Sequence, residues 1–329
     1  VSQGFNIWCP TLDEQVQWLA ARGLGEDFIP WNTDNRRNIG FLAAAERGVD
    51  LLVSIDDDNF CRGESDFVGE HAVVGRPLSA AHNADWAAGA GWFNICSLLE
   101  HSAGDAIYAR GFPYKVRNPG AQARLSGIPD AASNCIVALN AGLWLDDPDV
   151  DAITRLSLRP RVARAAGRAV ILSHETWSPI NTQNTGLMGA AIPAYYYVRM
   201  GFRLQGLRID RFGDILSGYF IQKCAKHLGH VLRLGSPVAD HVRSTHNLFK
   251  DLYFELAGIV LVEELLPWLQ ELRLEGSSYA EAYASLADAL AADSGRFTGF
   301  VWDEGGRDFL ASTTDCMRQW LGVVARVSR

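Results

Sequence analysis

The sequence lacks any arrangement of cysteines that would indicate a zinc site or a disulfide framework. Its cysteines are widely scattered, with no Cys-x-x-Cys pair and no histidines at zinc-finger spacing. We therefore expect free and mostly buried thiols, as in proteins of a reducing compartment. The six are Cys9, Cys61, Cys96, Cys135, Cys224 and Cys316.

The chain also lacks a cluster of lysines and arginines, and it lacks a long hydrophobic run. A net charge of -8 without a basic face argues against a nucleic-acid partner. The longest apolar stretch, residues 256–268, contains Glu263 and Glu264 and is too short to cross a bilayer, and no signal-peptide pattern is present. These absences predict a cytoplasmic protein without an integral membrane segment, and they allow a homo-oligomer.

What is present is the composition of a folded enzyme, with 48% hydrophobic and 21% charged residues in 329. Residues 4–10 have the pattern of a strand that leads into a helix. Thr11 and Glu14 have the spacing of a capping box at the start of that helix. Because the first residue is Val1, we expect that an earlier part of the natural protein lies outside this sequence.

The next elements place charged residues at the end of a strand. Residues 35–47 have helical periodicity, and Gly48 provides a left-handed stop. Residues 50–55 form a short apolar run typical of a central parallel strand buried on both faces, and residues 56–59 (DDDN) follow it directly. Open α/β sheets bind ligands at the carboxyl ends of their strands, so these carboxylates indicate a binding site.

The rest of the chain indicates an α/β domain followed by helices. We expect a nucleotide-binding domain over residues 1–245 and a helical extension packed on it over residues 246–329. The expected strands are residues 135–139, 169–173 and 231–234, and the expected helices are residues 214–228, 247–271, 278–291 and 305–324.

Three consecutive aspartates after a buried strand repel one another, and a metal ion would relieve this repulsion. In a strand, Asp56 and Asp58 would face one side and Asp57 the other, which is the geometry of a DxD metal site. A Mn²⁺ or Mg²⁺ ion held by Asp56 and Asp58 would bridge to the diphosphate of a nucleotide. The alternative is an acidic turn in which Asn59 makes the turn-forming hydrogen bond.

Polar residues before the helix that precedes this strand support the nucleotide hypothesis. Asn35, Arg36 and Arg37 lie in the run WNTDNRRN at residues 31–38, where they could reach a phosphate or a base. Arg36 or Arg37 would neutralise the charge of a diphosphate. The alternative is an exposed basic pair at a helix start.

Several segments occur in the same order as in a known family. The sequence resembles the reversibly glycosylated polypeptides, which are the UDP-arabinopyranose mutase family, and the similarity extends over about residues 35–271. The segments that carry it are residues 54–58 (SIDDD), 108–117 (YARGFPYKVR), 142–152 (GLWLDDPDVDA), 209–218 (IDRFGDILSG) and 263–268 (EELLPW).

The resemblance implies a GT-A-like, Rossmann-like sheet that binds a nucleotide-sugar, with helices on both faces and a C-terminal helical layer. It also implies that the three aspartates at residues 56–58 bind the metal and UDP, and that Trp144 contacts the nucleotide. Arg110 matches the arginine that becomes glycosylated in the family, and Arg117 matches a second arginine needed for activity. A guanidinium suits a phosphate or sugar contact and is a poor nucleophile, so glycosylation of Arg110 would be a side product. The alternative for both arginines is a surface ion pair.

Two further residues follow from the resemblance. His241 lies after a predicted strand, where GT-A-like enzymes supply another metal ligand, although a lone histidine is also compatible with a structural role. Asp214 lies at a helix start, in the acidic position that faces the sugar in such folds, and a helix-capping carboxylate is the alternative. The family's first strand, which contributes to its uracil pocket, is not found before Gly4. Residues 179–184 follow the family loop only loosely, so they leave the identity of the sugar open.

The leading hypothesis is a metal-dependent enzyme that interconverts the pyranose and furanose forms of a UDP-sugar. The runner-up is a glycosyltransferase that passes the sugar to a small-molecule or polymer acceptor. A third hypothesis is a non-catalytic partner subunit, against which the intact aspartates and arginines argue.

Overall fold

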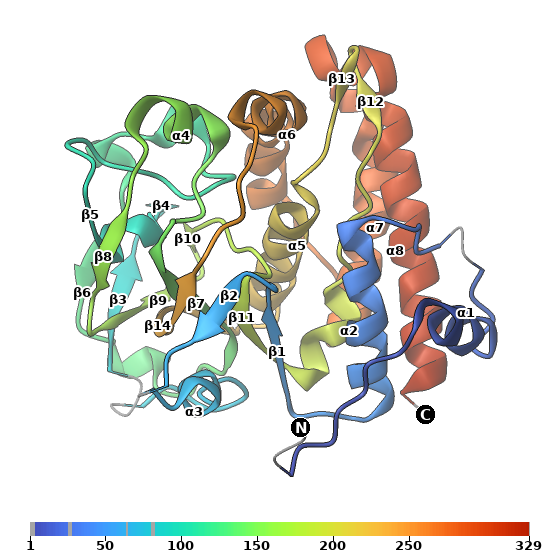
Figure 1. The fold of residues 1–329 in the computed structure, drawn as a ribbon, viewed down its shortest axis with the longest axis horizontal. Helices are drawn as coiled ribbons and strands as arrows, with labels where there is room; N and C mark the ends of the chain where they lie inside the picture. The colour runs from blue at the N-terminus through green and yellow to red at the C-terminus, as the bar shows by residue number, and fades with distance from the viewer. Residues whose placement is uncertain (1–3, 26–27, 64, 80–82, 329) are drawn as a thin grey trace.

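The computed structural model describes residues 4–25, 28–63, 65–79 and 83–328, which contain a ten-stranded mixed sheet (Figure 1). The main path has the order β1-β11-β7-β14-β9-β3-β6, with β2, β5 and β8 paired at its side. Its strands are β1 (Leu51–Ile55), β2 (Asn59–Cys61), β3 (Ala84–Ala88), β5 (Leu99–His101), β6 (Arg124–Ser126), β7 (Val137–Asp146), β8 (Val162–Ala165), β9 (Ala169–Leu172), β11 (Asn184–Met188) and β14 (Val231–His241). Two short pairs join β4 (Gly91–Trp92) to β10 (Thr176–Trp177), and β12 (Arg203–Leu204) to β13 (Leu207–Arg208).

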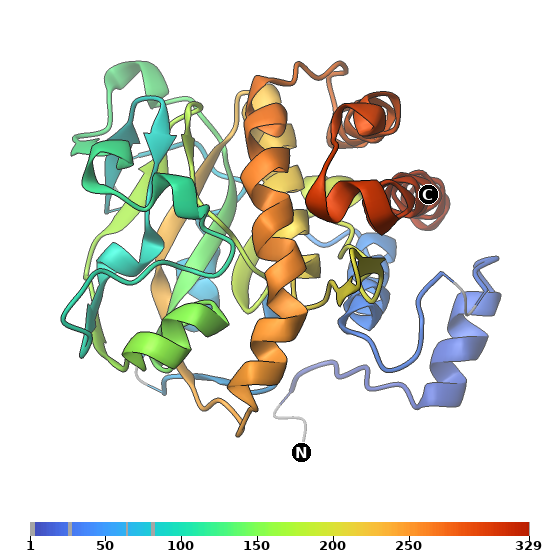
Figure 2. The same ribbon diagram turned by 90° about the horizontal axis from the view of Figure 1, so that it is seen from above.

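Helices cover the sheet and extend away from it on one side. Viewed from above, α6 runs along the sheet, and α7 and α8 lie beyond it (Figure 2). The helices are α1 (Leu12–Ala20), α2 (Arg37–Glu46), α3 (Phe67–His71), α4 (Ala152–Leu158), α5 (Gly213–His227), α6 (Leu248–Glu271), α7 (Tyr279–Asp293) and α8 (Arg307–Val327). None of the described helices is both long enough and apolar enough to cross a bilayer.

Both faces of the sheet are buried, as β9 shows. Its side chains alternate between two hydrophobic clusters: Val170 and Leu172 belong to the larger one, and Ala169 and Ile171 to the smaller one. The larger cluster includes residues of α5, α6, α7 and α8, whereas the smaller one includes Val74, just after α3. The predicted α/β class with a large Rossmann-like sheet is confirmed.

The C-terminal helices share this larger core. The same cluster contains Leu139 of β7, Leu261 of α6 and Trp320 of α8, so apolar packing is continuous across residue 245. The Trp320 indole also donates a hydrogen bond to the Pro193 carbonyl, at 3.1 Å. The described helices after residue 245 therefore share one core with the sheet, and the division into a domain over residues 1–245 and an extension over residues 246–329 stays a prediction.

Local predictions agree with the structure where a few neighbouring residues decide the conformation. Thr11 and Glu14 form the expected capping box at the start of α1. Gly48 has φ of 61° and follows the end of α2. All six cysteines are free thiols as predicted, but only Cys96, Cys224 and Cys316 are buried, so the thiols are not mostly buried as expected.

Two predictions about strands are wrong. Residues 4–10 form no regular structure and are mostly exposed. The run at residues 51–55 is a strand, but it lies at the end of the described sheet and pairs antiparallel with β11, so it is neither central nor paired with a parallel neighbour. Its apolar composition reflected partial burial, while its position in the sheet depends on long-range pairing.

The directions of three strands position the functional site. β11 pairs antiparallel with both β1 and β7, so β1 and β7 run in the same direction, and β14 is parallel to β7. The carboxyl ends of β1, β7 and β14 consequently lie at one edge of the sheet. That edge carries the residues after Ile55, those after Asp146, and His241.

Close packing of α5 against residues 179–183 provides a test of this arrangement. A Cβ atom on Gly218 would lie 1.9 Å from the Ile180 carbonyl oxygen, whereas one on Gly40 in α2 would have no neighbour within 4 Å. We predict that Gly218→Ala lowers the free energy of unfolding by about 1–3 kcal/mol through overpacking. Gly40→Ala should raise it by about 0.5–1 kcal/mol, because alanine favours the helix. Denaturant titration of both variants measures the difference, and equal effects would contradict the packing of α5 described here.

Candidate functional site

A cavity of about 290 Å³, here called the central cavity, lies at the edge where β1, β7 and β14 end. Its wall consists mainly of charged side chains. The acidic ones are Asp34, Asp56, Asp57, Asp58, Asp149 and Asp214; the others are Arg37, Arg110, Arg155, Arg211, Arg243, His241 and His246. Apolar ligands would find few contacts in it, so its chemistry suits a charged and polar ligand.

The three aspartates lie in a turn after β1 and not in the strand itself. The Asp56 amide donates to the Gln183 carbonyl at 3.0 Å, and the Asn59 amide donates to the Asp56 carbonyl at 3.1 Å. The alternation expected of a strand therefore does not apply to them, and the expectation that Asp57 faces away from Asp56 and Asp58 is corrected, because all three line the same cavity. Asp57 is exposed, while Asp56 and Asp58 have different partners.

Asp56 is paired with Arg37 from the first turn of α2. One guanidinium nitrogen of Arg37 forms a salt bridge with the Asp56 carboxylate, and the other donates to the Ser54 hydroxyl at 2.8 Å and to the Thr182 carbonyl at 3.0 Å. Burial raises the pKa of Asp56, and the charge of Arg37 opposes that rise. Arg37 therefore lines the cavity, as the sequence predicted, and it compensates the Asp56 charge within the protein.

Asp58 lies next to His241 because β2 pairs with the end of β14. In this pairing Asn59 lies opposite His241, and the Val242 amide donates to the Asp58 carbonyl at 2.9 Å. The His241 Nε2 atom is 3.3 Å from Oδ2 of Asp58. His241 Nδ1 contacts the Asp147 carbonyl oxygen, which only accepts hydrogen bonds, so Nδ1 carries the proton when the ring is neutral.

This arrangement has the donor chemistry of a divalent metal site. Burial lowers the pKa of His241, which favours the neutral ring with a lone pair on Nε2 facing the Asp58 carboxylate. The Nε2 lone pair and the carboxylate are both electron-pair donors, so their contact is favourable only when a cation lies between them. The described residues include no group of three or more His, Cys, Asp or Glu side chains able to hold a metal by themselves. A Mg²⁺ or Mn²⁺ ion commonly has one or two protein ligands and takes the rest from phosphates and water, so Asp58 and His241 fit such an ion.

Arg110 is held by two buried carboxylates. Its Nε and Nη2 atoms donate to Asp149 at 3.0 and 3.1 Å, and its Nη1 and Nη2 atoms donate to Asp214 at 3.1 and 2.7 Å. Nη1 also donates to the Arg211 carbonyl, so all five guanidinium N–H groups are used. Burial alone would lower the pKa of Arg110, but Asp149 and Asp214 outweigh it and raise the pKa well above its ordinary value.

Local structure fixes the two carboxylates. The Arg110 amide donates to the Asp149 carbonyl at 2.9 Å, and the Asn181 side-chain amide donates to the Asp149 carboxylate at 2.7 Å. Asp214 is in the first turn of α5, where the helix dipole favours a negative charge, and it accepts from the Ile215 amide at 2.9 Å. The N-cap of α5 is Phe212, so Asp214 is not the helix cap considered as the alternative, and its carboxylate lies on the cavity wall.

Arg117 does not line the central cavity in the described structure, although we expected it there. Its guanidinium lies 3.6 Å from the Tyr114 ring centre and donates to the Asp151 carboxylate at 2.5 Å and to the Phe112 carbonyl at 3.0 Å. Asp151 in turn caps α4 through the Thr154 amide. Arg117 thus holds the segment that follows Arg110.

Three residues predicted to contact the nucleotide are also absent from the central cavity wall as described. Asn35 is buried, and its side chain donates to the Tyr197 carbonyl at 2.6 Å. The Arg36 guanidinium packs on the Trp31 ring, 4.1 Å from its centre. Trp144 is buried in β7. A polar or aromatic residue type is compatible both with a ligand contact and with a contact inside the protein, so the sequence could not decide between them for these three residues.

Sequence reasoning did not assign roles to several basic residues of the wall. Arg155 is paired with Asp147, yet burial and the neighbouring charge of Arg243 lower the pKa of Arg155 to about 9. Arg211 donates to Glu255 at 3.1 Å. Their spacing in the sequence gave no signal, because they come from separate segments that meet only in the folded chain.

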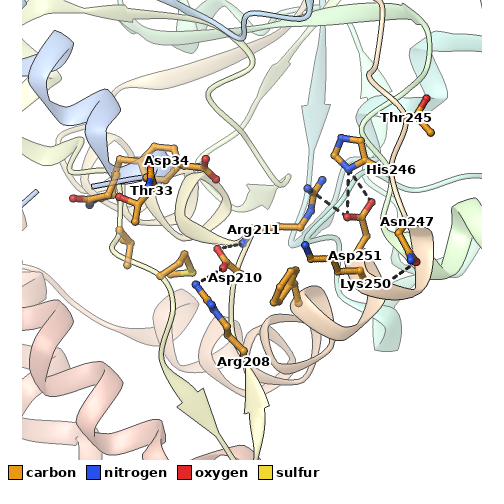
Figure 3. A pocket seen from close by; sticks show the side chains of 16 residues that line it. Thr33, Asp34, Arg208, Asp210, Arg211, Thr245, His246, Asn247, Lys250 and Asp251 are labelled. Carbon is orange, nitrogen blue, oxygen red and sulfur yellow. Dashed lines mark hydrogen bonds and ion pairs between the residues drawn. The ribbon is translucent and has the colours of Figure 1, made fainter. Parts of the chain in front are cut away.

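A second cavity of about 450 Å³, here called the outer cavity, adjoins the central one (Figure 3). The two share Asp34, Tyr197, Arg211 and His246 as wall residues. His246 and Arg211 are both turned toward the Asp251 carboxylate, at 3.2 and 3.7 Å. A ligand in the central cavity would therefore have open space beside it.

Comparison with known proteins relates this geometry to one family. The sequence model described as "Reversibly glycosylated polypeptide" matches residues 1–321. The probable UDP-arabinopyranose mutase 4 of Arabidopsis thaliana is 26% identical over 269 residues, which are 79% of this chain and 65% of the relative. The probable UDP-arabinopyranose mutase 1 of Pisum sativum is 30% identical over 185 residues, which are 55% of this chain and 45% of the relative.

A relative named as a UDP-arabinopyranose mutase, without the word "probable", has a similar identity and coverage. The UDP-arabinopyranose mutase 1 of Arabidopsis thaliana is 29% identical over 186 residues, which are 55% of this chain and 47% of the relative. The chain thus spans about half to two thirds of the length of these relatives. Since the family model covers nearly all of the sequence, the chain belongs to the reversibly glycosylated polypeptide family.

Proposed function

We propose that the chain binds a UDP-sugar in the central cavity and interconverts the pyranose and furanose forms of that sugar, as a UDP-arabinopyranose mutase does. One observation carries the proposal. The Asp58–His241 pair and the Arg110 ion cluster line the same cavity, at the strand ends where α/β sheets bind nucleotides. The family to which the chain belongs supplies the substrate class.

The metal-binding role falls to Asp58 and His241. A Mn²⁺ or Mg²⁺ ion held there would neutralise the charge of the diphosphate when UDP departs from the sugar. Arg155 and Arg243 lie on the same wall, and burial lowers the pKa of each, with like charge contributing. Crowded arginines of this kind favour an anionic ligand, and a diphosphate would relieve their repulsion.

The reaction exchanges one ring bond for another. UDP leaves the anomeric carbon C1, the bond from O5 to C1 is replaced by a bond from O4 to C1, and UDP attacks C1 again. The proton of the O4 hydroxyl ends on O5, so no atom is gained or lost. We assign the transfer of this proton to Asp56, which lines the same cavity and whose orientation Arg37 fixes.

Arg110 serves this scheme as a fixed positive charge. Its five N–H groups are all committed, and its raised pKa leaves no free lone pair for attack on a sugar. Its task is to hold Asp149 and Asp214 in place at the cavity wall. Arg117 acts as a positioning residue through Asp151 and the segment that links it to Arg110. A sugar on Arg110 would be a side product and not an obligatory intermediate.

The outer cavity favours one alternative, a glycosyltransferase. Its volume of about 450 Å³ and the four wall residues that it shares with the central cavity would accommodate a separate acceptor. A mutase needs no such acceptor, so the two functions differ in their need for a second substrate.

The first test distinguishes these functions directly. Incubated with UDP-arabinopyranose and Mn²⁺ and without acceptor, the protein should form UDP-arabinofuranose, which chromatography with NMR detection identifies. Slow release of free arabinose with no furanose nucleotide would refute the mutase assignment and support a transferase. Formation of neither UDP-arabinofuranose nor free arabinose would support a non-catalytic subunit.

The second test concerns the metal. We predict that Asp58→Asn weakens Mn²⁺-dependent UDP binding about tenfold or more, because it removes both a charge and a ligand oxygen. Asp240→Asn is the matched control, since Asp240 is adjacent to His241 but pairs with Arg62. Calorimetric titration with UDP, with Mn²⁺ and with EDTA, measures the affinities. If UDP binds equally well with EDTA and in the Asp58→Asn variant, the metal site is wrongly assigned.

The third test concerns Arg110. A lysine keeps one positive charge but cannot supply the five planar N–H groups that bind Asp149 and Asp214. We predict that Arg110→Lys lowers the rate of furanose formation at least about tenfold, which corresponds to about 1.4 kcal/mol. Arg164→Lys is the control, because Arg164 is exposed and pairs only with Glu100 among the described residues. Wild-type activity in a folded Arg110→Lys protein would rule out the proposed role.

A further inference from the structure

A third cavity, of about 860 Å³, lies at the opposite end of α5 from the central cavity. Lys223 and Lys226 of α5 line it, so we call it the lysine cavity. Asp214, at the other end of the helix, is roughly 18 Å away from Lys226 along the axis, at about 1.5 Å per residue. The lysine and central cavities have no wall residue in common.

Lysine is rare in this chain, and its distribution is uneven. Among 30 basic Lys and Arg residues, only four are lysines: Lys115, Lys223, Lys226 and Lys250. Two of these four line a single cavity, and Lys223 is only 8% exposed. Half of the few lysines in this chain therefore lie at a single cavity.

The two ammonium groups are only partly satisfied by hydrogen bonds. Lys226 donates to the carbonyls of Ser173 and Thr176, at 2.8 and 2.7 Å, and Lys223 donates to the carbonyl of Gln270, at 3.0 Å. Each ammonium has three N–H groups. Within the described part of the chain, three of the six N–H groups thus have no partner.

Neither lysine forms a salt bridge within the described residues. No carboxylate of the described residues forms an ion pair with either of them, although Glu175 and Glu271 belong to the cavity wall. Burial lowers the pKa of Lys223 to about 8, and burial together with the charge of Lys223 lowers the pKa of Lys226 to about 7. Carbonyl groups at the end of α5 and the Trp177 ring, 5.2 Å from the Lys226 nitrogen, offset only part of this cost.

We propose that the lysine cavity is a second ligand site, which binds the phosphate group of a phosphorylated small molecule between Lys223 and Lys226. A phosphate has three acceptor oxygens for the three unpartnered N–H groups, and its charge of nearly -2 matches two ammonium groups. The volume lies in the range of small-molecule sites, which leaves room beside a bare phosphate. Trp92 and Trp177 form an apolar part of the wall, suited to the organic portion of the ligand.

This site is independent of the proposed UDP-sugar site, because the two share no wall residue and lie at opposite ends of α5. Its ligand can therefore bind without displacing the substrate.

The four lysines allow a direct test by chemical labelling. The whole chain is acetylated with a limiting amount of an N-hydroxysuccinimide ester at pH 7, and peptide mass spectrometry follows each lysine separately. Inorganic phosphate should slow labelling of Lys223 and Lys226 at least about threefold relative to chloride at equal ionic strength. Lys115, which lines none of the three cavities, should be labelled at an unchanged rate, and this controls for the effect of salt on the reagent.

Two further labelling experiments identify which kind of phosphate compound binds in the lysine cavity. Glucose 1-phosphate represents a phosphorylated metabolite and UDP represents the nucleotide, each tested in the wild type and in Asp58→Asn. Stronger protection by glucose 1-phosphate than by phosphate supports a small-molecule site. Protection by UDP that persists in Asp58→Asn supports a nucleotide as the carrier of the phosphate, whereas protection by UDP that is lost in Asp58→Asn, without protection by phosphate, overturns the proposal.

Variants give an independent readout. Lys226→Met removes a buried charge while keeping an unbranched side chain of similar length, so the protein should remain folded. Phosphate should raise the melting temperature of the wild type and of Lys115→Met, but not that of Lys226→Met. Protection of Lys115 equal to that of Lys223 and Lys226, no protection by any phosphate compound, or an unchanged phosphate effect in Lys226→Met would each overturn the proposal.

Discussion

Two buried carboxylates share one guanidinium at the start of α5, and much of the site depends on this contact. Arg110 uses all five of its N–H groups on Asp149, Asp214 and a backbone carbonyl. Any one of these three charges, left alone at this depth, would be strongly unfavourable. Together they join the segment after β5, the segment after β7 and the helix α5, and they place two acidic groups on the wall of the central cavity.

The same balance of charge recurs around the cavity. Arg37 compensates Asp56, and Arg155 compensates Asp147, whereas the described partner of Asp58 is the His241 ring. The metal ion is therefore proposed at a carboxylate that faces a histidine and not an arginine. At the far end of α5 the opposite situation holds, because Lys223 and Lys226 are cations without carboxylate partners in the described structure.

The pairing of strands decided which residues meet in the site, and their order in the sequence did not. The Asp58–His241 contact joins residues 183 positions apart, and it depends on β2 pairing with the end of β14. Arg117 is only seven residues from Arg110, yet its side chain packs on Tyr114 outside the central cavity. Proximity along the chain was thus a poor guide to proximity in the site.

The sequence alone determined the α/β class, most of the longer helices, the capping box of α1 and the family, because these depend on local periodicity and on ordered motifs. It also identified Arg37, Arg110, Asp58, Asp214 and His241, all of which line the central cavity. Only the tertiary structure decided that β1 lies at the end of the described sheet, that the aspartates lie in a turn, and that Trp144 and Asn35 are buried in the protein. These features depend on pairing and packing between distant segments, and a residue's type does not specify which neighbour it meets.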